Sequence, residues 1–234
     1  MIDRINETLK KHLDPERHVY GFGDLTGLLD PVYSRVTHGI SILCRLDNPI
    51  IDGIGDGPTH EYYTLYTRVN LELNNIVAAV AKELTTDQYI FLPVYATIED
   101  AAIHESIVKT LTSNFSHKMV ATRSGLGWIG KTDLLISEQF GPRIRMASVV
   151  TNYVLPCNRI PINESRCGAC TKCVDSCPAN AANGIQWDIY TPREVFFDPF
   201  KCRQYCRLIT KKRLSIDNSL CGKCVLVCPM GKQH

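Results

Sequence analysis

The stretch CGACTKCVDSCP, from Cys167 to Pro178, decides how the last part of the chain folds. Its spacing, C-x2-C-x2-C-x3-C-P, is that of bacterial ferredoxins. In that pattern three closely spaced thiolates hold three corners of one [4Fe–4S] cubane, and the cysteine before the proline ligates a second cluster. The stretch therefore predicts a partner run of cysteines elsewhere in the chain.

That partner run is CGKCVLVCP, from Cys221 to Pro229, and it is one cysteine short. The missing ligand is expected in FKCRQYC, where Cys202 is the first choice and Cys206 the alternative. We name the two predicted centres cluster A and cluster B. Cluster A takes Cys167, Cys170, Cys173 and Cys228, and cluster B takes Cys177, Cys202, Cys221 and Cys224.

Two other uses of the cysteines fit less well. Structural zinc usually takes two C-x2-C pairs at longer spacing. A secreted disulfide framework would spread its cysteines along the chain and follow a signal peptide. Here nine of the eleven cysteines follow Cys157. Cys44, Cys157 and the unused member of the Cys202–Cys206 pair are expected to be buried free thiols.

Composition sets the broad class of the protein. The 234 residues are 44% hydrophobic and 21% charged, with a net charge of +2. Such a balance predicts no strong field for nucleic acid or a membrane surface. The opening MIDRINETLKKHLD has no apolar signal region, and the apolar run Ile76 to Ala81 is too short to cross a bilayer. We expect a soluble cytoplasmic protein with no membrane partner.

Along the chain we expect two domains, an α/β domain over residues 1–155 and a cysteine-rich domain over 156–234. Hydrophobic periodicity and strand-forming residues carry this expectation. The predicted helices are Ile5–Leu13, Thr59–Leu84 and Ala101–Leu111, and the predicted strands are His38–Leu46, Gln88–Val94, Asp133–Ser137 and Arg143–Val150. Strands that alternate with helices indicate a sheet covered by helices.

The segment RSGLGWIGKTDLL, Arg123 to Leu135, fits both the dinucleotide and the P-loop patterns. A P-loop needs a strand before its first glycine and a helix after its Lys-Thr pair. Here the residues before it read as helix and those after it as strand. The window VVTNYVL also lacks the acid that a dinucleotide site requires. Phosphate binding is therefore disfavoured, and the glycines are expected to admit something flat or large.

The chain resembles the epoxyqueuosine reductase family in three features taken together. These are the segment SGLGWIGKTDLLIS, a strand ending at Thr151 and the double cysteine run. Members of this family are cobalamin-dependent iron–sulfur reductases related to reductive dehalogenases, and the resemblance is close over residues 116–231. It implies a mixed sheet flanked by helices, followed by a small ferredoxin-like double-cluster domain. It also implies a base-off cobalamin reduced by the clusters. The implied corrin contacts are Gly125, Leu126, Gly127, Trp128, Ile129, Gly130 and Lys131.

Two features depart from the family pattern. The family carries an Asp-Tyr-His motif whose Asp donates a proton. The nearest match in this chain is Glu61-Tyr62-Tyr63, and we take these three as candidate catalytic residues. Glu61 could donate a proton if desolvation raises its pKa, or it could simply be a first-turn helix acid. The chain also ends six residues after Cys228, without the helical repeats that help the family bind tRNA. tRNA is therefore a doubtful partner.

The expected function is an oxidoreductase. Electrons would come from a small donor, a ferredoxin or flavodoxin, and pass through both clusters to a corrinoid. A small-molecule substrate, different from or smaller than tRNA, would then be reduced. The alternative is a two-cluster carrier, or a corrinoid-reducing partner without substrate chemistry of its own. An ATP-coupled reductase is a third, weaker option that depends on the P-loop match.

Overall fold

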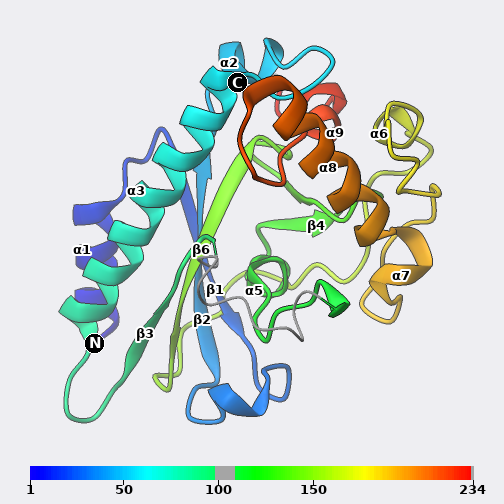
Figure 1. The fold of residues 1–234 in the computed structure, drawn as a ribbon. Helices are drawn as coiled ribbons and strands as arrows, with labels where there is room; N and C mark the ends of the chain where they lie inside the picture. Colours follow the sequence, from blue (N-terminus) through cyan, green and yellow to red (C-terminus); the bar gives the residue numbers. More distant parts are fainter. Residues whose placement is uncertain (98–108, 233–234) are drawn as a thin grey trace. The chain divides into compact units, whose positions relative to one another are not determined.

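The computed structural model describes residues 1–97 and 109–232 (Figure 1). His104 and most of the predicted helix Ala101–Leu111 lie outside the described residues. The chain forms two compact units that interleave along the sequence. Unit 1 comprises Met1–Arg45, Arg68–Leu126 and Arg145–Ile162, and unit 2 comprises Leu46–Thr67, Gly127–Ile144 and Asn163–His234. The division at residue 155 stays a prediction, which limited proteolysis tests.

Unit 1 is built on a four-stranded sheet with the order β1-β2-β6-β3. Its strands are β1 (His18–Asp24), β2 (His38–Arg45), β3 (Phe91–Val94) and β6 (Ile144–Thr151). β1 runs antiparallel to β2, and β3 runs antiparallel to β6. The predicted strands at β2, β3 and β6 are confirmed, whereas β1 was not predicted. The fold is a mixture of helices and sheet, as the sequence indicated.

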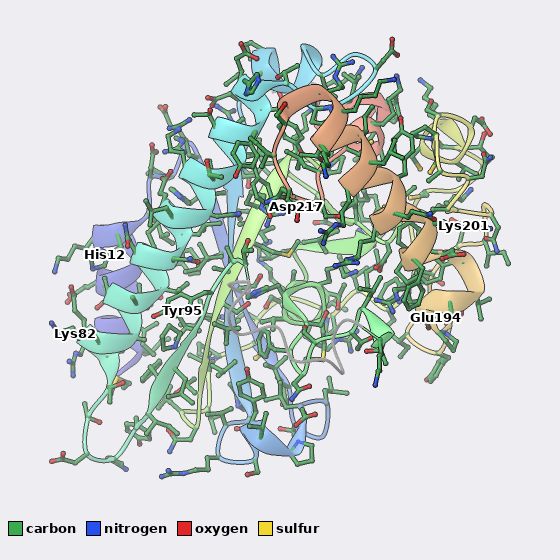
Figure 2. All side chains as sticks on the ribbon, viewed as in Figure 1. His12, Lys82, Tyr95, Glu194, Lys201 and Asp217 are labelled. Carbon is green, nitrogen blue, oxygen red and sulfur yellow. The ribbon has the colours of Figure 1, made fainter. Side chains whose placement is uncertain are left out.

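Helices flank this sheet. α1 (Ile2–His12) and the part of α3 (His60–Leu84) in unit 1 lie on one side, and α5 (His117–Arg123) lies on the other (Figure 1). His12, labelled in Figure 2, comes within 2.9 Å of the carboxylate of Glu83, which holds α1 against α3. The predicted cap of α3 is confirmed, because the Thr59 hydroxyl accepts from the backbone N–H of Tyr62 at 3.1 Å. A short 3-10 helix, η1 (Pro31–Tyr33), completes the unit.

Unit 2 consists of a small hairpin and short helices. The hairpin pairs β4 (Gly127–Ile129) with β5 (Leu135–Ser137). The helices are α2 (Asn48–Asp52), α6 (Lys172–Asp175), α7 (Arg193–Phe196), α8 (Pro199–Leu214) and α9 (Lys223–Val227). Arg143, 1% exposed, joins α2 to the chain after the hairpin by bonding Asn48 at 2.9 Å and Asp52 at 2.6 Å.

A helix must be long and predominantly apolar to cross a bilayer. None of the helices in residues 1–97 or 109–232 is long and apolar enough to cross a membrane.

Candidate metal centre

The thiols assigned to cluster A come together in unit 2. α6, which carries Cys173, packs against α9, and Cys228 follows directly after α9. Burial, together with charge repulsion from the neighbouring Cys173, Cys167 and Cys170, raises the pKa of the Cys228 thiol to about 11. Thiols that interact in this way lie close together. The sequence-distant Cys228 therefore stands beside the three closely spaced cysteines, as the ferredoxin pattern predicts.

A second group of thiols gathers around α8 and α9. Burial raises the pKa of the Cys224 thiol, with further increases from nearby Cys221 and Cys202. Cys206 Sγ lies 3.8 Å from Cys202 Sγ, and Cys206 also bonds Cys221. Both α8 cysteines thus stand next to the predicted cluster B. The choice of Cys202 over Cys206, and the assignment of Cys177, stay predictions.

Among the described residues, no set of three cysteine sulfurs lies mutually within 4.8 Å, the spacing at which three ligands could share one metal ion. Zinc binds thiolates at about 2.3 Å, so sulfurs that share one ion stand about 4 Å apart. Among the described residues, one set of three ligand atoms lies mutually within 4.8 Å, and it is formed by His18, Cys44 and Glu72 of unit 1. In the described part of the chain no three of the clustered cysteines meet this limit, although Cys202 Sγ and Cys206 Sγ lie 3.8 Å apart.

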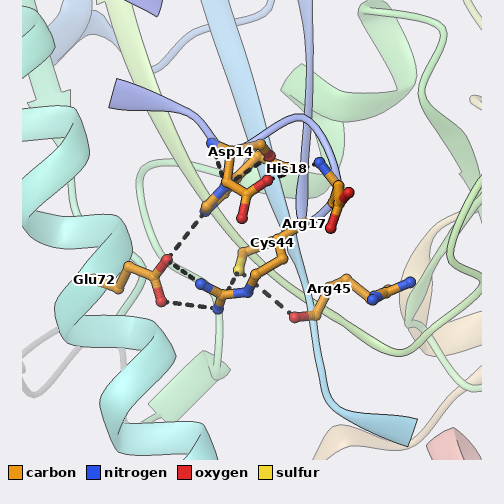
Figure 3. A network of polar contacts seen from close by, with 7 residues as sticks. Asp14, Arg17, His18, Cys44, Arg45 and Glu72 are labelled. Carbon is orange, nitrogen blue, oxygen red and sulfur yellow. Dashed lines mark hydrogen bonds and ion pairs between the residues drawn. The ribbon is translucent and has the colours of Figure 1, made fainter. Parts of the chain in front are cut away.

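The His18–Cys44–Glu72 set already contains a cation, the guanidinium of Arg17 (Figure 3). Arg17 bonds both carboxylate oxygens of Glu72, at 2.8 and 3.0 Å, and lies 3.5 Å from Cys44 Sγ. His18 and Cys44 face each other across β1 and β2. This network joins the sheet to α3. Cys44 and Cys206 are buried as expected, whereas Cys157 is exposed, contrary to expectation.

The hairpin of unit 2 brings three side chains to the cysteines. The Trp128 indole Nε1–H donates to Cys167 Sγ at 3.4 Å. Lys131 Nζ donates to the carbonyl oxygens of Gly168 at 2.9 Å and Cys170 at 3.0 Å. The Thr132 hydroxyl bonds the sulfurs of Cys173 and Cys224, one from each predicted cluster. Sequence reasoning singled out this segment but expected it to face a different cofactor.

The glycines of this segment are explained by close approach of the chain to itself. A Cβ on Gly127 would lie 2.2 Å from the Ile136 carbonyl oxygen, and one on Gly130 would lie 3.0 Å from the Ile136 side chain. In unit 1, a Cβ on Gly125 would lie 2.8 Å from the Ile160 carbonyl oxygen. Close packing of the chain on itself therefore accounts for these glycines without a corrin. The seven corrin contacts stay predictions.

The segment is also not a phosphate loop. Helix α5 precedes it and strand β5 follows Thr132, whereas a P-loop has a strand before and a helix after. The elements on either side of the segment are therefore the ones expected from the sequence, and they are the reverse of those around a P-loop. The structure supplies no support for an ATP-coupled reductase at this segment.

The candidate catalytic residues begin α3, in the part of this helix that belongs to unit 2. Glu61 is exposed, and its own backbone N–H and the Thr59 side chain lower the pKa of its carboxyl. Tyr62 is buried and Tyr63 is half-buried. The Tyr62 ring stands so close to Gly222 that a Cβ there would lie 2.7 Å from it. Catalytic roles for these residues stay predictions.

Comparisons with known proteins agree with the cysteine geometry. Residues 166–231 match the family model of a 4Fe-4S double cluster binding domain. The chain is 33% identical to an epoxyqueuosine reductase of Bacillus cereus over 129 residues, which are 52% of this chain and 31% of that protein. The corresponding protein of Listeria monocytogenes is 31% identical over 130 residues, with 53% and 31% covered. The matched part of the chain thus spans about a third of the length of these curated relatives.

Solved structures show the same fold. An epoxyqueuosine reductase from Streptococcus thermophilus matches with a TM-score of 0.56 at 16% identity, over 100% of this chain and 67% of that one. A reductive dehalogenase, described with a mechanism for B12-dependent dehalogenation, matches with a TM-score of 0.68 at 19% identity, over 92% and 30%. Residues 166–231 are therefore a double [4Fe–4S] cluster binding domain. The chain that carries them resembles epoxyqueuosine reductases in sequence over about half of its length and in fold.

Proposed function

We propose that the chain is a reductase that passes electrons through two [4Fe–4S] clusters to a bound corrinoid. One observation carries the electron path. Cys173 of cluster A and Cys224 of cluster B are near enough to interact, and the Thr132 hydroxyl bonds both sulfurs. Two cubanes held by these thiolates would stand side by side, so an electron could pass from one to the other.

The corrinoid is supported by the likeness to epoxyqueuosine reductases and by a fold shared with a B12-dependent dehalogenase. When bound, a corrinoid supplies a cobalt centre whose reduced form is a strong nucleophile and reductant. The residues of this chain would hold the clusters and position the substrate. We also propose the cytoplasm as the location and a ferredoxin or flavodoxin as the electron donor.

A carrier without a corrinoid is the second candidate, and the closed packing around Gly125, Gly127 and Gly130 favours it. One experiment separates the two. The protein is purified without oxygen, its iron is counted, and cobalamin is titrated in while the visible spectrum is recorded. The reductase predicts saturable binding with a base-off spectral shift. Iron-loaded protein that leaves the cobalamin spectrum unchanged would support the carrier.

The substrate class is tested with the reduced protein. Free epoxyqueuosine nucleoside and an epoxyqueuosine-modified tRNA stem loop are offered separately, and product is measured by mass spectrometry. We expect turnover of the small molecule and little or none of the stem loop. Turnover of the stem loop alone would overturn the proposal that tRNA is not the substrate.

Proton donation by Glu61 is the remaining part of the proposal. The lowered pKa of the exposed carboxyl means that a bound substrate must exclude water before Glu61 holds a proton at neutral pH. Glu61→Gln should lower the turnover number by about a hundredfold to ten-thousandfold, the usual range for lost acid–base catalysis. Glu194→Gln is the matched control, because Glu194 is also an exposed first-turn helix acid (Figure 2). Equal turnover in both variants would remove Glu61 from the mechanism.

A further inference from the structure

We infer that Trp128 and Lys131 of the β4–β5 hairpin set the reduction potential of cluster A, holding it above the value that the four thiolates alone would give. The inference rests on the proposed clusters but not on the corrinoid or the substrate. Both side chains contact the loop that carries the cluster A cysteines, and neither has a role in the electron path proposed above.

The Trp128 contact goes directly to a cluster ligand. Its Nε1–H donates to Cys167 Sγ at 3.4 Å, and the side chain is only 5% exposed. The register of the hairpin fixes this position, because Trp128 pairs with Ile136 while Gly127 lets the two strands approach. A hydrogen bond to a ligand sulfur withdraws electron density from the thiolate. It therefore favours the reduced, more negative cluster.

The Lys131 contact brings a positive charge to the same loop. Its side chain is nearly buried, since the residue is 4% exposed, and Nζ donates to the carbonyls of Gly168 and Cys170. These two residues belong to the run that holds three corners of cluster A. A buried charge is screened by water much less than an exposed one. The ammonium therefore stabilises the extra negative charge of the reduced cluster and fixes the loop.

The redox step itself is simple. A [4Fe–4S] cluster in the 2+ state takes one electron from the donor and becomes the 1+ state, with no bond made or broken at the thiolates. The net charge of the cluster and its four thiolates changes from −2 to −3 in this step. Both hairpin contacts interact more favourably with the −3 state. Removing either contact should make cluster A harder to reduce.

The test is a potentiometric titration of the iron-loaded protein followed by electron paramagnetic resonance. Trp128→Phe removes the N–H and keeps an aromatic ring, and Lys131→Met removes the charge and keeps an unbranched chain. In each variant we expect one of the two reduction waves to move to lower potential. At a fixed potential the ratio of reduced to oxidised cluster should fall about tenfold. This corresponds to a shift of about 59 mV for a one-electron step.

Controls separate tuning from damage. Lys212→Met removes an exposed charge of α8 and should leave both waves in place, and Lys131→Arg should keep the wild-type potential. If Lys131→Met loses iron, Trp128→Phe decides. Iron-loaded variants with both waves unmoved would overturn the inference, as would an equal shift of both waves. A wild-type protein that binds no iron would instead contradict the cluster assignment itself.

Discussion

Gly127 shows how little room the hairpin leaves at a single residue. Its missing side chain would collide with the Ile136 carbonyl oxygen, 2.2 Å from an ideal Cβ. A backbone atom cannot give way as a flexible side chain can. The two strands must therefore separate if any other residue stands there, and Trp128 would move with them.

We predict that Gly127→Ala destabilises the protein by about 1–3 kcal/mol, the usual cost of overpacking. Gly53→Ala is the matched control, because its Cβ would meet its nearest atoms at 3.5 Å and its φ is −77°. Thermal unfolding of the iron-loaded variants measures the difference. Equal melting temperatures for the two variants would show that the hairpin is looser than described.

Cys202 and Cys206 offer a second test of single residues. Serine in place of a cluster ligand should lower the iron content and disturb cluster B, whereas serine at the other position should not. We predict the loss for Cys202→Ser, because the Cys224 thiol interacts with Cys202. Iron and sulfide analysis of the purified variants measures it. The reverse result would make Cys206 the eighth ligand.

At the scale of elements, residue pattern predicted α3 and β2 but missed β1 and the sixteen-residue helix α8. α3 has an apolar face over many turns and a capping threonine, and β2 centres on the apolar residues Ile40, Ile42, Leu43 and Cys44, so both are visible in the sequence. β1 contains Gly21 and Gly23, which disfavour a strand. A Cβ at Gly21 would lie 2.9 Å from the Ser124 carbonyl oxygen. These glycines serve the packing of the residues at the end of α5, a contact that no local pattern reveals.

His117, the first residue of helix α5, is expected to make the stability of the protein depend on pH. Burial lowers the pKa of His117 to about 4, and the ring bonds the Ser148 hydroxyl and the Tyr95 carbonyl. The unfolded chain takes up this proton near pH 6.5, whereas the folded one does so only near pH 4. Stability is therefore full above pH 6.5 and falls as the pH drops toward 4.

When the pH is lowered from 8 to 6, protonation of His117 in the unfolded chain should reduce the free energy of unfolding by about 0.8 kcal/mol. His117→Gln should lose that part of the pH dependence, which denaturant unfolding at the two pH values measures. A nuclear magnetic resonance titration of the ring gives its pKa directly. A value near 6.5 would contradict the account.

For the whole molecule, the cysteine spacing predicted the second cluster, and the structure brings Cys228 to the first cysteine run. What the sequence did not reveal is the interleaving. Residues 46–67 and the hairpin belong to the same compact unit as the cysteines. Trp128, Lys131 and Thr132 meet the cysteine run some forty residues later in the chain. Such contacts depend on tertiary packing, which spacing and periodicity do not encode.

The central claim is that swapped thiolates of unit 2 hold two [4Fe–4S] clusters. Iron and sulfide analysis of the anaerobically purified chain, combined with Mössbauer spectroscopy, tests it most directly. The account predicts about eight iron and about eight sulfide ions per chain, all in cubane clusters. Bound zinc in place of iron, or a stable content of only about four irons, would contradict it.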